Sequence, residues 1–378
     1  MRSAGGTGIF RIPHSALRIR VGAAVRRLAG RAWGRRPVRA MTRVPVTCRA
    51  ASPLLPVGRP LKVLTWNVQF LAGKGYVFWY DLPDNRGPHS RPSRAAIART
   101  AAAVAAVIRA ERPDLVLLQE VDQGAARTNH EDQLARLLAL LPAEYACTTS
   151  TFYWKAPYVP HPRVRGAAGL TLCTLARYTI RVAGRWPLAV PPANRLTQQL
   201  SPRRVILETR LPLAGGGELV VLNTHLDAFA QGTATMARQV AQVGHRLRQL
   251  TAAGRPWVLG GDFNLLPPDA AAYDRLPASH QAYYNRPTEL APLLAVYPAV
   301  PSPTEAAGPQ APAWFTHFPN DPAIPAPDRT IDYLFFAPAV RVGAHYVRQH
   351  DTLTISDHLP VVSIFTVDPA AASAGESF

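Results

Sequence analysis

Apolar runs of strand length alternate with helical patterns through most of this chain, and their order constrains the fold more than any other feature. A glycine turn at 213–217 joins two of the strand candidates as a hairpin would. Since a purely parallel sheet contains no hairpins, the order predicts a mixed α/β sheet. Strands are expected at 61–68, 114–121, 169–177, 203–212, 217–226, 256–264, 330–338, 341–349 and 359–367, and helices at 93–113, 130–142 and 233–254.

The remaining segments are long and rich in proline, and connections of this length in a compact domain are usually functional or mobile. We expect such loops at 72–93, 151–168, 185–202 and 266–329.

Composition fits a globular protein of one large domain or two small ones, with 48% hydrophobic and 17% charged residues. No apolar run reaches the roughly 18 residues of a membrane span, and no apolar core of a secretory signal is present. A soluble protein is therefore expected, with the cytoplasm as the default compartment. Three cysteines without a CxxC pair predict neither a disulfide scaffold nor a zinc-thiolate site, and Cys173 is expected in the core.

The net charge of +18 comes mostly from one end of the chain. Residues 1–60 hold 13 arginines and no acidic residue, which leaves +5 for the rest. Residues 1–58 are therefore interpreted as a basic tail outside the fold, either a disordered arm or a consequence of translation that begins at Met41. The predicted domain spans residues 59–368, followed by a short tail at 369–378.

Polar side chains stand at or near the ends of several apolar strands, where packing does not require them. Each alone has an ordinary structural explanation, such as a turn former, a helix cap or a satisfied core histidine. Together they predict one cluster, because the strands of one sheet can bring such residues to one edge. Carboxylates gathered there would repel each other unless a cation neutralised them. The residues are Asn67, Glu120, His225, Asp262, Asn264, Asp332, Asp357 and His358.

The chemistry of this set favours hydrolysis of a phosphoester. Amide and carboxylate oxygens suit Mg²⁺, with Mn²⁺ or Ca²⁺ as alternatives, rather than Zn²⁺. Either Asp262 or His358 with its partner would activate water, while His225 and Asn264 would bind the phosphoryl oxygens. Asp262 and Asn264 are expected to face the same way on an extended segment. Asp332 is a candidate to orient His358.

Six stretches resemble the endonuclease/exonuclease/phosphatase superfamily, which includes DNase I-like nucleases and neutral sphingomyelinases. They read TWNVQ, LLQEV, NTHLD, GGDFN, TIDYLF and SDHLPV, in the family's order over residues 61–367. The resemblance implies a four-layer α/β sandwich with two central mixed β-sheets flanked by helices.

By the same resemblance, each residue of the set takes a role. Asn67 and Glu120 look like the metal pair, with Asp357 as a metal or neighbouring ligand. His225 and His358 look like the histidines beside the phosphate, and Asp332 like the carboxylate partner of a histidine. Asp262 and Asn264 look like the residues that position the nucleophile and stabilise the transition state. The role of Gln69 stays open, because some members have an acid there. Ala176 and Thr179 depart from the usual family strand without touching the chemistry.

The substrate is left open by the sequence. Two loops rich in aromatic residues, with Trp79 and Trp154, suggest contact with a phospholipid-like substrate or a membrane surface. Packing of these aromatics on each other is the alternative. Arg163 and Arg165 could instead meet the phosphates of a nucleic acid, as an endonuclease or exonuclease would require. A non-catalytic scaffold is a third hypothesis, which the intact polar set disfavours, and no obligate protein partner is evident.

Overall fold

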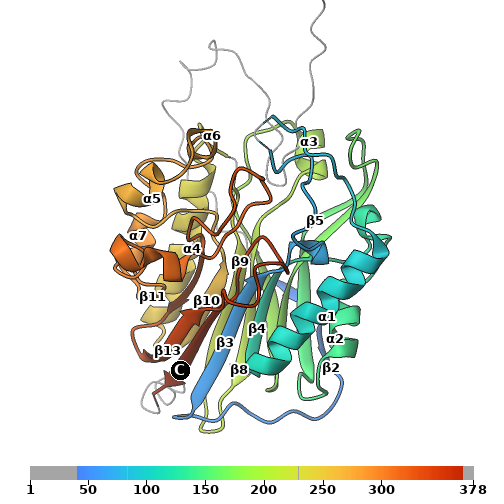
Figure 1. The fold of residues 1–378 in the computed structure, drawn as a ribbon. Helices are drawn as coiled ribbons and strands as arrows, with labels where there is room; N and C mark the ends of the chain where they lie inside the picture. The colour runs from blue at the N-terminus through green and yellow to red at the C-terminus, as the bar shows by residue number, and fades with distance from the viewer. Residues whose placement is uncertain (1–40, 83, 229, 369–378) are drawn as a thin grey trace, which may run out of the picture.

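Two seven-stranded sheets stack face to face, with helices outside them (Figure 1). The computed structural model describes residues 41–368 apart from residues 83 and 229, and the predicted tails at 1–40 and 369–378 lie outside the described residues. Figure 1 shows α1 and α2 on one side of the stack and α4, α5 and α7 on the other. This is the four-layer sandwich that the sequence predicted.

Each sheet mixes parallel and antiparallel pairs: β3 runs parallel to β4 and β9 to β10, whereas the other pairs are antiparallel. The first sheet has the order β1 (Thr42–Val44), β7 (Val182–Pro187), β8 (Val205–Pro212), β9 (Glu218–His225), β10 (Trp257–Asp262), β12 (Asp332–Phe336) and β11 (Ala299–Val300). The second has the order β13 (Val340–Val347), β14 (Val361–Val367), β3 (Pro60–Asn67), β4 (Leu115–Asp122), β6 (Gly166–Ala176), β5 (Cys147–Val159) and β2 (Val46–Cys48).

Within the described residues the helices are fewer than the strands, and α1 and α4, with 18 residues each, are the longest. They are α1 (Arg94–Glu111), α2 (Gln133–Leu140), α3 (Arg195–Leu200), α4 (Thr235–Ala252), α5 (Ala270–Asp274), α6 (Ala278–Gln281) and α7 (Ala291–Leu294), with 3-10 turns η2 (Gln69–Leu71), η3 (Ala126–Thr128) and η4 (Gly308–Trp314).

Alternating side chains explain why the second sheet is buried on both faces. In β3, Val63 belongs to the core between the sheets, whereas Leu64 and Trp66 belong to the core beneath α1 and α2. Successive residues of a strand point to opposite faces, so a continuous apolar run can fill two layers at once. The run of unbroken apolar residues in β4 has the same cause.

Gly260 and Gly261 let β10 lie close to its neighbours. A Cβ on Gly260 would come within 2.8 Å of the Leu117 and Leu334 side chains, and one on Gly261 within 2.0 Å of the Thr224 carbonyl oxygen. Gly261 also has a φ of +155°, which disfavours other residues. The glycine pair therefore permits β10 to lie close to its neighbours, and it brings the end of β10 against β9.

Three segments predicted as loops contain strands, and one of them, 266–329, holds only the short β11. β5 occupies half of 151–168, and β7 begins just before 185–202 and enters it. β5 carries polar, charged and proline residues, which hid its alternation, yet it pairs with β6 along most of its length. Tertiary pairing decided this strand, because its buried positions face the other aromatic loop rather than a continuous core.

The predicted boundary at residue 58 is wrong for residues 41–58. β1 pairs with β7 and β2 with β5, so this segment adds an edge strand to each sheet. Short strands with little apolar content give no signal until their partners are known.

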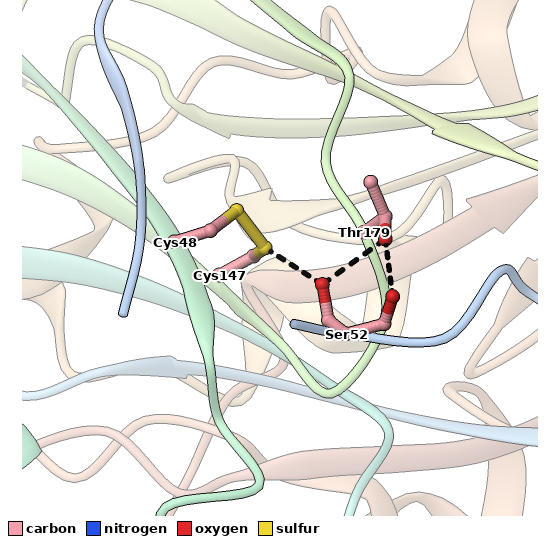
Figure 2. Close-up of a disulfide and its surroundings, with 4 residues drawn as sticks. All are labelled: Cys48, Ser52, Cys147 and Thr179. Atoms are coloured by element: carbon pink, nitrogen blue, oxygen red, sulfur yellow. Dashed lines mark hydrogen bonds between the residues drawn. A yellow bond between two sulfur atoms is a disulfide. The ribbon is translucent and has the colours of Figure 1, made fainter. Parts of the chain in front are cut away.

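A disulfide joins Cys48 of β2 to Cys147 of β5, which contradicts the prediction of unpaired cysteines (Figure 2). The two residues are direct partners in the β2–β5 register, a proximity that a separation of 99 residues conceals. Ser52 lies beside the bond, with its Oγ 3.1 Å from Cys147 Sγ and 3.0 Å from Thr179 Oγ1. Cys173 is buried and unbonded to another cysteine, as expected. In the described part of the chain, no helix has the length and apolar character needed to cross a bilayer.

Candidate active site

The polar strand ends predicted from the sequence meet around one pocket, here called the strand-end pocket. Six of the eight predicted residues line it, and the other two, Asn67 and Asp332, hydrogen-bond to residues that do. Sheet register explains the convergence, because Asp262 stands opposite both His225 of β9 and Asp332 of β12. The lining predicted residues are Glu120, His225, Asp262, Asn264, Asp357 and His358.

Asp262 lies at the centre of the cluster. Its Oδ2 accepts a hydrogen bond from Asn67 Nδ2 at 3.0 Å and lies 3.3 Å from His225 Nε2 and 3.6 Å from His358 Nε2. Its Oδ1 accepts from the Asn264 backbone N–H at 2.9 Å. Burial is the main reason that the pKa of Asp262 rises to about 7, although the positive charge of His358 opposes the rise. A carboxylate with such a pKa can exchange a proton near neutral pH.

His358 is held by Asp332, as the sequence predicted. Its Nδ1 lies 2.9 Å from Asp332 Oδ2, which leaves Nε2 to face Asp262. Burial opposes protonation, but the charges of Asp332 and Asp262 outweigh it and raise the pKa of His358 to about 10. The imidazole is therefore a cation at neutral pH and can donate a hydrogen bond through Nε2.

Glu120 reaches the pocket through a local irregularity of β4. Its φ is +57°, and the pairing between β4 and β6 shifts between Leu118 and Val121. A bulge of this kind turns a side chain that would otherwise follow the strand's alternation. Burial first, and then the negative charge of Asp357, raise the pKa of Glu120 to about 7. Such strain in a non-glycine residue is typical of functional sites.

Asn264 lies near Asp262, but not on the extended segment that was predicted. Its φ of +53° bends the chain, and its Nδ2 donates to the Leu226 carbonyl at 3.1 Å. The bend also aims the Asn264 backbone N–H at Asp262. Both residues still line the strand-end pocket. The sequence therefore predicted correctly that Asp262 and Asn264 lie together, but not the backbone conformation that places them there.

Buried polar contacts fix the two sheets to each other beneath the pocket. Gln119 Nε2 donates to Asn223 Oδ1 at 2.8 Å, across the space between β4 and β9. Within the second sheet, Trp66 Nε1 of β3 donates to the His358 carbonyl at 2.8 Å and so fixes the segment that leads into β14. A buried donor or acceptor without a partner costs free energy. These hydrogen bonds therefore help to fix the positions of the strand ends relative to one another.

Arg204 is a pocket residue that sequence reasoning missed. It precedes β8, is only 2% exposed, and pairs through Nε with Asp227 Oδ1 at 3.2 Å. Its Nη1 has no hydrogen-bond partner among the described residues. A buried guanidinium nitrogen without a partner fits an anion that enters the pocket. Nothing in the sequence around Arg204 distinguished it from the many surface arginines.

The long segment after β10 supplies further residues that line the pocket. The sequence analysis did not single out any residue of this segment as part of a site. His280 lies 3.0 Å from Asp321, and Arg329 pairs with Asp328 at 2.6 Å. His317 packs edge-on against His358, with ring centroids 4.5 Å apart. Burial and the charge of His358 lower the pKa of His317 well below its usual value, so this imidazole is neutral.

A second hollow, here called the aromatic hollow, lies beside the strand-end pocket and shares Tyr80 with it. Trp79 and Trp154 line it but are only 6% and 5% exposed. Trp79 stacks on His161 with centroids 4.4 Å apart, and Trp154 Nε1 donates to the Leu200 carbonyl. Of the two interpretations left open by the sequence, the burial of both tryptophans favours packing of the aromatic loops on each other over contact with a membrane.

The two predicted arginines separate in the structure. Arg163 lines the aromatic hollow, whereas Arg165 is exposed and lines neither cavity. A different groove collects Lys155, Arg185 and Arg203 on the strands and loops beside Tyr153.

Several donor atoms could hold a divalent cation. Asp357 and His358 form one possible ligand group with His317, and Asp262, Asp332 and His358 form another. Glu120 is buried and Asp357 half-buried. Desolvation raises the pKa of both carboxyl groups, and the charge of Asp357 also raises that of Glu120. A cation near both would offset this cost, so the donors fit a hard divalent ion. Gln69 is buried, and its amide atoms have no hydrogen-bond partner among the described residues.

Comparison with known families gives one match, to the endonuclease/exonuclease/phosphatase family over residues 64–358. Among solved structures, the chain resembles TDP2 from C. elegans with a TM-score of 0.50 and 17% identity, covering 82% of this chain and 76% of that one. An endonuclease/exonuclease/phosphatase from Beutenbergia cavernae DSM 12333 gives a TM-score of 0.48 and 26% identity, over 82% and 72% of the two chains.

The catalytic domain of human Nocturnin, solved with a sulfate anion, gives a TM-score of 0.48 and 18% identity, over 81% of this chain and 94% of that one. A comparison with curated proteins finds no match.

Proposed function

The chain belongs to the endonuclease/exonuclease/phosphatase family, and from this premise we propose that it is a divalent-metal-dependent phosphodiesterase. The observation that carries the proposal is the position of Asp262, whose Oδ2 faces Asn67 and the Nε2 atoms of two histidines. One carboxylate between two imidazoles can take a proton from water while the imidazoles bind the phosphoryl oxygens.

Asn67, Glu120 and Asp357 would hold a divalent cation, for which Mg²⁺ is the first candidate. Asn67 Oδ1 already accepts from the Gln69 backbone N–H at 3.0 Å and keeps a second lone pair. When bound, the cation polarises a phosphoryl oxygen and offsets the charge that develops during the reaction.

The pKa values assign the proton-transfer roles between Asp262 and His358. His358, with a pKa of about 10, carries its proton at neutral pH and serves as a donor to a phosphoryl oxygen. Asp262, with a pKa raised to about 7, is the group able to accept a proton from the attacking water. These pKa values favour Asp262 as the proposed base, a role that the sequence left open between Asp262 and His358.

Arg204 and His225 are the remaining residues proposed to bind the phosphate. Both line the pocket, and Arg204 Nη1 is the buried donor without a partner among the described residues. A donor placed before the substrate arrives costs no reorganisation when negative charge builds on the phosphoryl group.

For the substrate we propose a small or phospholipid-like phosphodiester whose extension occupies the aromatic hollow. Support comes from Tyr80, which lines both cavities, and from the tryptophan and arginine side chains beyond it. Contact with a lipid would then involve its head group, since Trp79 and Trp154 are buried.

A nuclease is the second candidate, favoured by a different observation. The groove with Lys155, Arg185 and Arg203 presents three cationic side chains and no acidic one. Such a groove can follow the phosphates of a nucleic acid.

The test uses the full chain with Mg²⁺ or with EDTA, on bis(p-nitrophenyl) phosphate, sphingomyelin liposomes and supercoiled plasmid in parallel. Metal-dependent cleavage of any of these, lost in Asp262→Asn, supports the hydrolase. Phosphocholine release without nicking favours the lipid substrate, and nicking alone favours the nuclease. Equal activity of Asp262→Asn and the wild type would refute the mechanism, and no activity on any substrate would favour the scaffold.

A further inference from the structure

We propose that His317, Asp357 and His358 form a second binding site, for a transition-metal cation of the Zn²⁺ class, which shares Asp357 with the proposed Mg²⁺ site, and that its occupation inhibits hydrolysis. Donor atoms of the three residues all lie within 4.8 Å of one another. The set differs from the oxygen donors Asn67 and Glu120 by its two imidazoles. The inhibitory part rests on the proposed function, whereas the binding part does not.

The donor types decide which cation fits. Two imidazole nitrogens and one carboxylate oxygen suit Zn²⁺, Co²⁺ or Ni²⁺, which bind imidazole well, whereas Mg²⁺ prefers oxygen ligands. Three protein ligands leave further positions for water or a phosphate oxygen. The two cation classes should therefore distribute between different ligands of the same pocket.

His317 has a nitrogen that no described residue uses. Its Nδ1 is buried and lacks a hydrogen-bond partner within the described residues. A buried polar atom without a partner costs free energy unless a ligand or water satisfies it. The other pocket histidine of the same segment, His280, is instead bonded to Asp321.

The backbone holds the three ligands in place before any cation binds. The His317 N–H donates to the Arg329 carbonyl at 3.1 Å, and the Phe318 N–H donates to the Asp357 carbonyl at 2.6 Å. His317 also forms a bridge with His358, where the two rings pack edge-on. Because the ligands are linked by these contacts, little chain entropy remains to be lost on binding.

Inhibition follows from the nitrogen of His358 that the cation would take. Nδ1 is occupied by Asp332, so Nε2 is the atom that would ligate the cation, which displaces the Nε2 proton to solvent, and Nε2 is also the atom that faces Asp262. A cation on Nε2 would prevent this imidazole from donating to a phosphoryl oxygen. The same cation would draw Asp357 away from the ligands proposed for Mg²⁺.

The experiment compares the full-length wild type with His317→Ala, after removal of metals by chelation. Zn²⁺ affinity is measured by calorimetry, and Co²⁺ is titrated as a spectroscopic probe of nitrogen ligation. Zn²⁺ is then titrated into the Mg²⁺-supported hydrolysis reaction. We expect His317→Ala to bind Zn²⁺ at least tenfold more weakly and to require at least tenfold more Zn²⁺ for half-inhibition. The Mg²⁺-supported rate without Zn²⁺ is measured for each variant, and half-inhibition is expressed relative to that variant's own rate.

His280→Ala is the matched control, because it removes a buried histidine of the same pocket outside the ligand group. It should keep the wild-type Zn²⁺ affinity. If His317→Ala fails to fold, His317→Gln, which keeps most of the volume, replaces it. Equal Zn²⁺ affinity and equal Co²⁺ spectra in the wild type and the His317 variant would overturn the site. Binding that depends on His317 but does not inhibit would overturn the inhibitory part. A wild type without hydrolytic activity would refute the proposed function alone, since the binding measurement still tests the site.

Discussion

The strand-end pocket and the aromatic hollow share the Tyr80 side chain, yet opposite kinds of interaction build them. The pocket gathers buried carboxylates and imidazoles whose pKa values are displaced by burial and by each other. The hollow is lined in part by Trp79, Tyr80 and Trp154, which belong to a cluster of buried aromatic and aliphatic side chains that holds the loops together.

The strand-end pocket and the aromatic hollow are expected to differ in what they contribute, the pocket to catalysis and the hollow to the stability of the fold. A cluster of buried polar groups is costly and persists because the sheets impose it, as the left-handed φ values of Glu120 and Asn264 indicate. Packed aromatics contribute stability directly through burial. Changes in the pocket should therefore alter catalysis more than folding, and changes in the hollow should do the reverse.

The largest effect is expected for Asp262→Asn. Loss of the proposed base should lower kcat by about 10³-fold, since general-base catalysis contributes 10²–10⁴-fold. Stability should not fall, because the variant removes a buried carboxylate whose pKa burial has raised. The kcat with Mg²⁺ and the midpoint of urea unfolding measure the two. Asp269→Asn, at the cap of α5, is the control and should leave kcat unchanged. A large loss of stability in Asp262→Asn would break the contrast between the two regions.

Trp154→Ala should act in the opposite way. Removal of this buried ring should destabilise the fold by about 3 kcal/mol, as large-to-small core changes do. Urea unfolding measures the change, and kcat of the folded fraction should remain within about tenfold. Trp154→Phe, which keeps a ring but loses the bond to the Leu200 carbonyl, should cost about 1 kcal/mol. A folded Trp154→Ala protein with unaltered stability would show that the hollow is not a packing unit.

Cys48→Ser tests whether the edge strands contribute stability without affecting the pocket. Neither Cys48 nor Cys147 lines the strand-end pocket. Because the bond closes a loop across a separation of 99 residues, its loss should destabilise the protein by about 2–4 kcal/mol. Thermal unfolding measures the loss, while kcat should change less than twofold. Ser52→Ala keeps the disulfide and should cost less than about 1 kcal/mol. An unchanged melting temperature in Cys48→Ser would argue that the bond contributes nothing.

Asp332→Asn alters His358 without removing it. Its expected effect, about tenfold in kcat, corresponds to about 1.4 kcal/mol and is the smallest of the four in free energy. Asp332 raises the pKa of His358, so the variant should lower that pKa and move the alkaline limb of the pH–rate profile to lower pH. The raised pKa also stabilises the fold below the unfolded-state pKa of about 6.5, and this contribution is lost as pH rises through about 10. In Asp332→Asn the difference in stability from the wild type should therefore shrink at alkaline pH. An alkaline limb that does not move would separate Asp332 from the protonation of His358.

The strand ends show how far prediction from sequence could reach. Asp262 and His358 are recognisable because apolar runs predict the neighbouring strands, and each of these residues lies next to the end of such a run. The pairing of Asp332 with His358 could be foreseen on similar grounds. Arg204 and His317 could not, since nothing in a single sequence separates a buried arginine or histidine from an exposed one.

The apolar periodicity and the polar residues at strand ends by themselves determined the mixed α/β architecture and the residues that gather at one edge. Both depend on short-range patterns, which a chain carries whatever its final contacts. Only the tertiary structure decided the pairing of β2 with β5, the disulfide, the burial of Trp79 and Trp154, and the bend at Asn264. These features depend on which distant segments pack together, and the free energy of that packing is a property of the whole fold.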